Sequence, residues 1–133
     1  MVEMIEIFKE LQQVINGPEA ERTKEWYFGK FFTGDINLKI DTQSFIMSFY
    51  QGEMINVVEG TPLSGFDFGL SGTWERWDDF FKKGIFGFAT APAYQNPLGL
   101  TVTGNVMRFR QNYNICAHVC KELARLCRER GIA

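Results

Sequence analysis

The sequence predicts one α/β domain of the α+β type, in which helices cover a five-stranded, largely antiparallel sheet and a long helix ends the chain. Three observations predict this fold class. Apolar residues recur every three or four positions near both ends, they alternate with polar residues in five segments between, and short turn-rich links join the first four segments. A chain of 133 residues has room for one core, so we expect a single domain over residues 1–133.

The first segment predicts an amphipathic helix with apolar residues at spacings of three and four: Met4, Ile5, Phe8, Leu11 and Ile15. Gly17 is expected to end this helix in the left-handed conformation, and Pro18 cannot continue it. Pro18 also suits the first turn of a second helix that would carry Trp26 and Tyr27. A loop over residues 26–32 fits that stretch equally well.

Four alternating segments then predict four successive strands. Their apolar positions are Ile36, Leu38 and Ile40, then Phe45, Met47 and Phe49, then residues within 54–59, and finally Phe66, Phe68 and Leu70. Because the links are short, we expect each strand to pair antiparallel with the next, as in a meander. A fifth strand is expected where Leu100 and Val102 alternate with threonines.

A helix is expected between the fourth and fifth strands. Thr73 suits its N-cap and Gly84 ends it. Its apolar stripe is Trp74, Trp77 and Phe81, and its expected i,i+4 ion pairs are Asp78 with Lys82 and Asp79 with Lys83. Residues 85–97 are apolar but contain Gly87, Pro92 and Pro97, so we expect an apolar loop that covers other residues or is itself covered.

The chain is expected to end in one long helix that begins after Gly104-Asn105 and stops at Gly131. Its apolar stripe is Val106, Phe109, Tyr113, Cys116, Cys120, Leu123 and Cys127. From Asn105 onward the charge is +4, against −6 for the remainder. These cations suit the C-terminal end of a helix dipole, and contact with an acidic partner or anionic headgroups is the alternative.

Composition excludes several classes of function. A net charge of −2 gives no global support for nucleic-acid binding. No apolar run reaches the roughly 20 residues that span a bilayer, so no stable membrane insertion is expected. The N-terminus lacks the basic start and apolar run of a signal peptide, and the three cysteines are an odd number, which suits a reducing compartment. We therefore expect a cytoplasmic protein.

Few residues suggest chemistry. Cys116, Cys120 and Cys127 are predicted to be small buried apolar residues, because a zinc site needs four ligands and no partner pair is present. The single histidine, His118, is expected to point away from the face that carries Cys116 and Cys120, which disfavours a catalytic Cys–His pair. No metal, cofactor or phosphate loop is predicted. Asp67 is expected to face solvent, and a buried general base there is the alternative.

Two segments resemble the sterol-carrier-protein family of lipid-transfer domains. Residues 70–84, LSGTWERWDDFFKKG, are similar to that family's strand end, acidic-aromatic helix and glycine. Residues 98–109, LGLTVTGNVMRF, are similar to its closing strand, Gly-Asn turn and last helix. The N-terminal third matches only in the order of elements. Residues 94–99, YQNPLG, depart from the glycine, small residues and Lys-Gly pair that usually precede the closing strand.

The resemblance implies a sheet covered by helices with an apolar tunnel between them, which holds a fatty acyl chain, acyl-CoA or a sterol-like molecule. The chain has 13 phenylalanines, and its apolar positions outnumber what one sheet face needs. The predicted ligand-binding residues are Phe66, Phe68, Trp77, Phe81, Phe86, Phe88, Phe109 and Tyr113. A solid phenylalanine-rich core would give the same pattern.

The leading hypothesis is therefore a non-catalytic carrier of an apolar small molecule or lipid. Two alternatives stay open. In the second hypothesis the chain is an accessory module that forms a homodimer or docks on a partner enzyme through residues 85–97 and the basic helix. In the third hypothesis it is an enzyme on a small apolar substrate, with a buried acid at Asp67 or Asp41.

Overall fold

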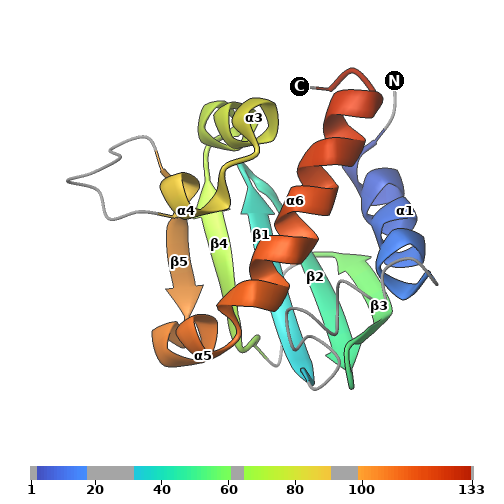
Figure 1. Ribbon diagram of the computed structural model, residues 1–133, viewed down its shortest axis with the longest axis vertical. Helices are drawn as coiled ribbons and strands as arrows, with labels where there is room; N and C mark the ends of the chain where they lie inside the picture. Colours follow the sequence, from blue (N-terminus) through green and yellow to red (C-terminus); the bar gives the residue numbers. More distant parts are fainter. Residues whose placement is uncertain (1–2, 18–31, 61–64, 91–98, 133) are drawn as a thin grey trace.

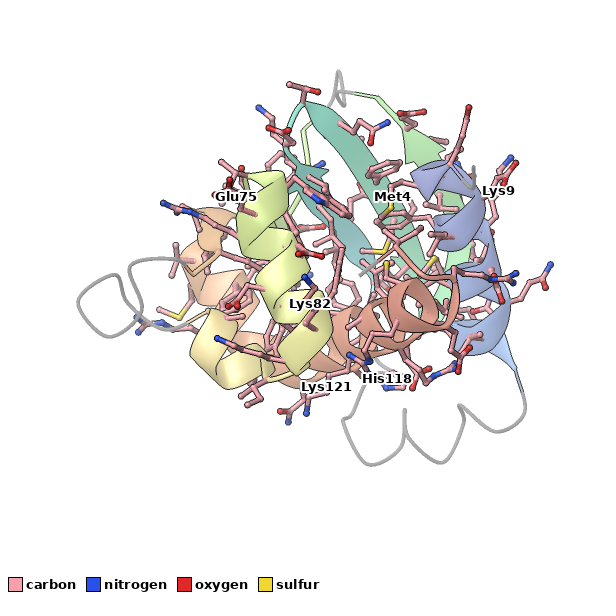
Figure 2. The ribbon with its side chains drawn as sticks, turned by 90° about the horizontal axis from the view of Figure 1, so that it is seen from above. Met4, Lys9, Glu75, Lys82, His118 and Lys121 are labelled. Carbon is pink, nitrogen blue, oxygen red and sulfur yellow. The ribbon has the colours of Figure 1, made fainter. Side chains whose placement is uncertain are left out.

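The computed structural model describes residues 3–17, 32–60, 65–90 and 99–132, and it contains one mixed sheet with the described helices packed on one face (Figure 1). Seen from above, the sheet lies on one side and α1, α3 and α6 on the other (Figure 2). The helices are α1 (Met4–Asn16), α3 (Trp74–Lys83), α4 (Phe86–Ala89), α5 (Val106–Gln111) and α6 (Tyr113–Glu129). The strands are β1 (Gly34–Ile40), β2 (Gln43–Tyr50), β3 (Glu53–Glu59), β4 (Phe68–Gly72) and β5 (Thr101–Gly104).

The strand order is β3-β2-β1-β4-β5, so the predicted four-strand meander is wrong beyond its third strand. β1, β2 and β3 pair antiparallel in sequence, but β4 crosses to the other side of β1 and pairs with it in parallel, Leu38 opposite Leu70. The outer edge of β3 is already occupied at Met54, whose backbone carbonyl accepts hydrogen bonds from the side chains of Gln12 and Asn16. β4 lies at the opposite edge of these three strands, beside β1. β5 then pairs antiparallel with β4.

The inward faces of the strands confirm the predicted alternation. The side chains that they bury are Ile36, Leu38, Ile40, Phe45, Met47, Phe49, Phe68 and Leu70. On β1, Lys39 between two of them is exposed, as a period of two requires, but Asn37 on the same face is buried and donates hydrogen bonds to Ser44 and to the carbonyl of Phe45. α1 covers this face at the β2–β3 side, where the rings of Phe8 and Phe45 stack at a centroid distance of 4.3 Å.

The helix ends differ partly from expectation. Gly84 ends α3 in the left-handed conformation with φ 68°, as predicted, and both i,i+4 ion pairs form. The same prediction for Gly17 at the end of α1 is wrong: its φ of −74° and ψ of 163° are extended, the conformation that a residue preceding a proline favours. The expected second helix from Pro18 lies outside the described residues.

The predicted long C-terminal helix is two helices. Asn105 caps α5 by accepting a hydrogen bond from the backbone N–H of Arg108 at 3.1 Å. The helix is interrupted at Asn112, whose φ is −116°. Its backbone N–H and its side-chain amide both donate hydrogen bonds to carbonyls of α5. The break turns α5 to lie against the end of β4 and β5, and it leaves Val106, expected in the apolar stripe, exposed. Part of the expected loop 85–97 is α4, and residues 91–98 lie outside the described residues.

Candidate functional site

The candidate ligand site is a layer of aromatic side chains between the sheet and the helices α3 to α6. The rings contact one another in a continuous chain that runs from β2 to the start of α3. Its members are Phe49, Phe32, Phe68, Phe109, Phe86, Tyr113, Phe80, Phe81, Trp77 and Trp74. We refer to these ten residues as the aromatic layer.

The sheet end of the aromatic layer rests on β4. Phe68 points inward from β4, and its ring meets Phe109 of α5 edge-on at 5.9 Å and Phe32 at 5.8 Å. Phe32 precedes β1 and also meets Phe49 of β2 at 5.5 Å. These ring contacts link α5, whose single buried side chain is Phe109, to β4 directly and to β2 through Phe32.

The centre of the aromatic layer is Phe86 on the four-residue helix α4. Its ring contacts Phe80 at 6.1 Å, Phe109 at 6.4 Å and Tyr113 at 5.2 Å. At the α3 end, Phe81 meets Trp77 at 5.7 Å. The indole N–H of Trp77 donates to the carbonyl of Lys39 at 2.8 Å, which fixes that ring against β1. Phe86 thus joins the rings of α3 to those of α5 and α6.

The structure brings six of the eight predicted ligand-binding residues into the aromatic layer. Phe68, Trp77, Phe81, Phe86 and Phe109 are buried there, and Tyr113 is half-buried. Phe66 is half-buried beside Gly104 and is not one of the ten. The side chain of Phe88 lies outside the described part. Which of them touch a ligand stays a prediction.

Sequence reasoning missed four members of the aromatic layer: Phe32, Phe49, Trp74 and Phe80. Phe80 follows Trp77 by three residues in α3, so helical spacing alone would have placed it on the same face. Phe32 lies in a stretch for which the sequence supports both a helix and a loop. Phe49 and Trp74 were predicted on apolar faces but not in the site, because local sequence patterns do not show which end of a strand or helix lies near α5.

The rings of the aromatic layer pack against one another, and Trp77, Phe68, Phe81 and Phe86 are almost wholly inaccessible to solvent. Hollows are present on the outside, where β1 and β4 end and α3 begins. One has a volume of about 350 Å³ and is lined by Lys39, Asp41, Ser71, Gly72, Thr73, Arg76 and Thr101. A neighbouring hollow of about 360 Å³ involves Glu75 and Asp79. Such charged and hydroxyl-bearing walls do not suit an acyl chain.

Asp67 holds the start of β4 in place. Its Oδ2 accepts a hydrogen bond from the backbone N–H of Asp35 at 2.7 Å, and its Oδ1 lies 3.9 Å from Nε of Arg108. Arg108 in turn donates to the carbonyl of Thr33 at 3.1 Å and lies over the ring of Phe32. Asp67 lies just before β4 and is half-exposed. This carboxylate is engaged in linking β1, β4 and α5.

The cysteines are buried along α6. A hydrogen bond with the Cys116 thiol, together with burial, raises the pKa of Cys120 well above its ordinary value. Burial raises the pKa of Cys127 to about 12. Thiols with such pKa values are poor nucleophiles at neutral pH. His118 lies between the first two in sequence and is also buried. Across the described ranges, no three His, Cys, Asp or Glu side chains gather as a metal site would require.

Comparisons with known proteins find the same fold among solved structures. No protein-family model matches the chain, and no curated protein matches it. A crystal structure of sterol carrier protein 2 aligns with a TM-score of 0.67 and 11% identity, over 89% of this chain and 93% of that one. A conserved hypothetical protein of Thermus thermophilus, described as a candidate sterol carrier protein, aligns with a TM-score of 0.60 and 13% identity, over 90% and 82%.

A third structure is the apo form of sterol carrier protein 2 from Yarrowia lipolytica, with a TM-score of 0.54 and 17% identity, over 89% of each chain. At these identities the likeness establishes the fold. The chain has the sterol-carrier-protein fold over nearly its whole length, as the two sequence segments suggested. No described helix is both long and apolar enough to cross a membrane.

Proposed function

We propose that this protein binds and carries an apolar ligand between its sheet and the helices α4, α5 and α6, and that it does no chemistry. One observation carries the proposal: a continuous aromatic layer joins the sheet to two very short helices in a fold shared with proteins named as sterol carriers. A fatty acyl chain, acyl-CoA or sterol-like molecule suits such walls.

Because these rings pack against one another, we expect a ligand that binds among them to displace some of them. Phe86 is the best candidate, since its helix α4 has four residues and its ring has three aromatic contacts. Aromatic contacts contribute about 0.5–1.5 kcal/mol each, so moving Phe86 costs roughly 2–4 kcal/mol. The larger helices α1 and α6 bury many more side chains and would cost more to move.

The length of the ligand follows from this cost. Burial of an acyl chain gains about 0.8 kcal/mol per CH₂, hence about 13 kcal/mol for a chain of roughly sixteen carbons. Association itself costs at least about 4 kcal/mol, to which the displacement of Phe86 is added. A chain of about eight carbons would barely offset these costs, so we expect long-chain ligands to bind and short ones not to.

The carboxylates and thiols that could act in catalysis support the proposal that the protein is not an enzyme. Asp67 is held by the backbone of β1 and lies near Arg108, and the Cys120 and Cys127 thiols have raised pKa values. Asp41 lies in the tight turn after β1 with φ 58°, is exposed, and lines the outer hollow with its charged and hydroxyl-bearing walls. A carrier acting in the cytoplasm accords with its buried thiols, which form no disulfide.

The test is titration of the delipidated protein with fluorescent long-chain and short-chain fatty acids and a fluorescent sterol, with native mass spectrometry of the protein as purified. We expect saturable binding of a long-chain ligand. Phe86→Leu should raise the affinity about fivefold, because less ring contact is lost on opening. Phe8→Leu removes a buried ring of the separate Phe8–Phe45 pair and serves as the matched control. No binding, or equal effects of both substitutions, would contradict the proposal.

A further inference from the structure

Residues 80–121 contain no aspartate or glutamate. They carry five basic residues, whereas the rest of the chain carries nine basic and sixteen acidic residues and a net charge of −7. This acid-free segment supplies the end of α3, then α4, β5, α5 and the first half of α6. In Figure 1, α4, β5 and α5 together form one side of the molecule, opposite α1 and β3.

α5 presents apolar side chains to solvent within this acid-free segment. Met107 is 63% exposed and Val106 is 47% exposed, while Phe109 of the same helix is buried in the aromatic layer. Arg110 is exposed one helical turn from both, at i+3 from Met107 and i+4 from Val106. We call Val106, Met107 and Arg110 the α5 face. Ile85, 58% exposed, precedes α4, which packs on α5 through Phe86 and Phe109.

The cation of the α5 face is not neutralised by the described residues. Arg108 lies near Asp67, and Lys82 pairs with Asp78, so these charges are largely compensated. Arg110 has no acidic partner in the described ranges. Lys121, also exposed on the helical side of the molecule, has none there either (Figure 2). The distant acids are screened, because the Debye length is only about 10 Å at 0.1 M salt.

We propose that the α5 face docks on an anionic lipid bilayer. Two apolar side chains beside a cation match the headgroup boundary, where the apolar groups enter the acyl region and the guanidinium reaches lipid phosphates. A protein partner fits less well, since a stable protein interface involves about 20–30 residues on each side, whereas the α5 face has three. The other side of α5 carries Phe109, so docking places a wall of the aromatic layer at the membrane.

The proposal does not depend on what the protein carries, because docking is measured without a transferable ligand. The intact protein is sedimented with vesicles of phosphatidylcholine alone and of phosphatidylcholine with an equal amount of phosphatidylglycerol. We expect binding to the anionic vesicles only, and release as salt is raised. Met107→Asp should weaken binding about tenfold and Arg110→Glu at least fivefold, from about 1 kcal/mol per cation near the surface.

Ile55→Asp is the matched control, because Ile55 is 59% exposed on β3 and lies between exposed Glu53 and Glu59. It should change binding less than twofold. Met107→Gln repeats the test with an uncharged helix-compatible residue. Equal binding to neutral vesicles, no binding, or equal loss with Ile55→Asp overturns the proposal. So does self-association that Met107→Asp abolishes, which would assign the α5 face to a second copy. Fatty-acid binding without vesicle binding overturns docking alone, and the reverse overturns carriage alone.

Discussion

The two edges of the sheet are built in opposite ways. At the β3 edge, the long helix α1 lies against the strand, and the side-chain amide of Asn16 both donates to and accepts from the backbone of Met54, at 2.9 Å each. Asn16 thus takes the place of a neighbouring strand. The exposed apolar residue Ile55 lies between two glutamates, which discourages edge-to-edge pairing.

At the β5 edge, the strand has four residues and its neighbours are the short helices α4 and α5. Few backbone contacts hold them: Leu100 donates to the carbonyl of Ala89 at 2.7 Å, and Asn105 donates to the carbonyl of Asp67 at 2.8 Å. Arg108 adds a hydrogen bond to the carbonyl of Thr33 and lies near Asp67, and the rings of the aromatic layer supply the apolar contacts. We therefore expect the β3 edge to contribute more to the stability of the fold, and under the proposals above the β5 edge is the side that ligand and membrane would contact.

The largest effect is expected at Gly104, where β5 passes into α5. Its φ is +74°, and an added Cβ would lie 2.9 Å from the carbonyl oxygen of Asp67 and 3.0 Å from Cα of Phe68. Gly104→Ala should therefore lower the free energy of unfolding by about 3 kcal/mol, measured by urea unfolding followed by circular dichroism. Gly131 has a φ of +72° with no atom within 4 Å of an added Cβ. Gly131→Ala should cost only about 1 kcal/mol. Equal losses of stability in the two variants would show that the close contacts around Gly104 do not add to the cost of the substitution.

A smaller effect is expected when the β3 edge is released. Asn16→Ala removes two hydrogen bonds to Met54 and leaves its N–H unsatisfied, at a cost of roughly 2 kcal/mol. Alanine's better helix propensity returns about 0.6 kcal/mol, so a net loss of about 1.5 kcal/mol is expected in urea unfolding. Gln13→Ala, at an exposed neighbour on α1, is the control. Fatty-acid affinity should not change, and a large change would contradict the division between the edges.

Much of this arrangement followed from local patterns in the sequence. Alternation placed Leu38 and Phe68 on the buried face, and the i,i+4 spacing gave the ion pairs of α3, because both depend on neighbours a few residues away. The parallel pairing of β4 with β1 did not follow, since it joins residues that are far apart in the sequence, such as Leu38 and Leu70. Local signals say which side chains are buried, not which strand lies beside which.

The candidate site divides in the same way. Spacing on α3 pointed to Trp77 and Phe81, and both are buried in the aromatic layer. The break at Asn112 was not predicted, because one asparagine within a helical pattern is a weak signal. The exposure of Val106 and Met107 was therefore not predicted either. The exposed face of α5 arises from tertiary packing, which divides the predicted continuous helix into two helices that bury different faces.

The last effect is smallest at neutral pH, grows as the pH rises above 9, and concerns Cys127 on the half of α6 nearer α1. Burial raises the pKa of its thiol to about 12, above the value near 9 expected when unfolded. The folded state therefore holds this proton more tightly, and its contribution to stability is complete below pH 9 and is lost as the pH rises toward 12. Urea unfolding should show the wild-type losing up to about 1.4 kcal/mol per pH unit more than Cys127→Ala in that range.

The same thiol reports whether the α1 side stays closed during binding. If only the β5 edge opens, a saturating fatty acid should leave the rate at which a thiol reagent modifies Cys127 unchanged or slower. That rate is measured at about pH 8 in the wild-type and in Cys116→Ala/Cys120→Ala, which isolates Cys127 as the remaining cysteine. An increase in the rate on ligand binding would mean that α6 lifts from the sheet along its length, because a buried thiol reacts only when its cover moves. The ligand would then enter beside α1 as well, and the contrast between the two edges would not decide the path.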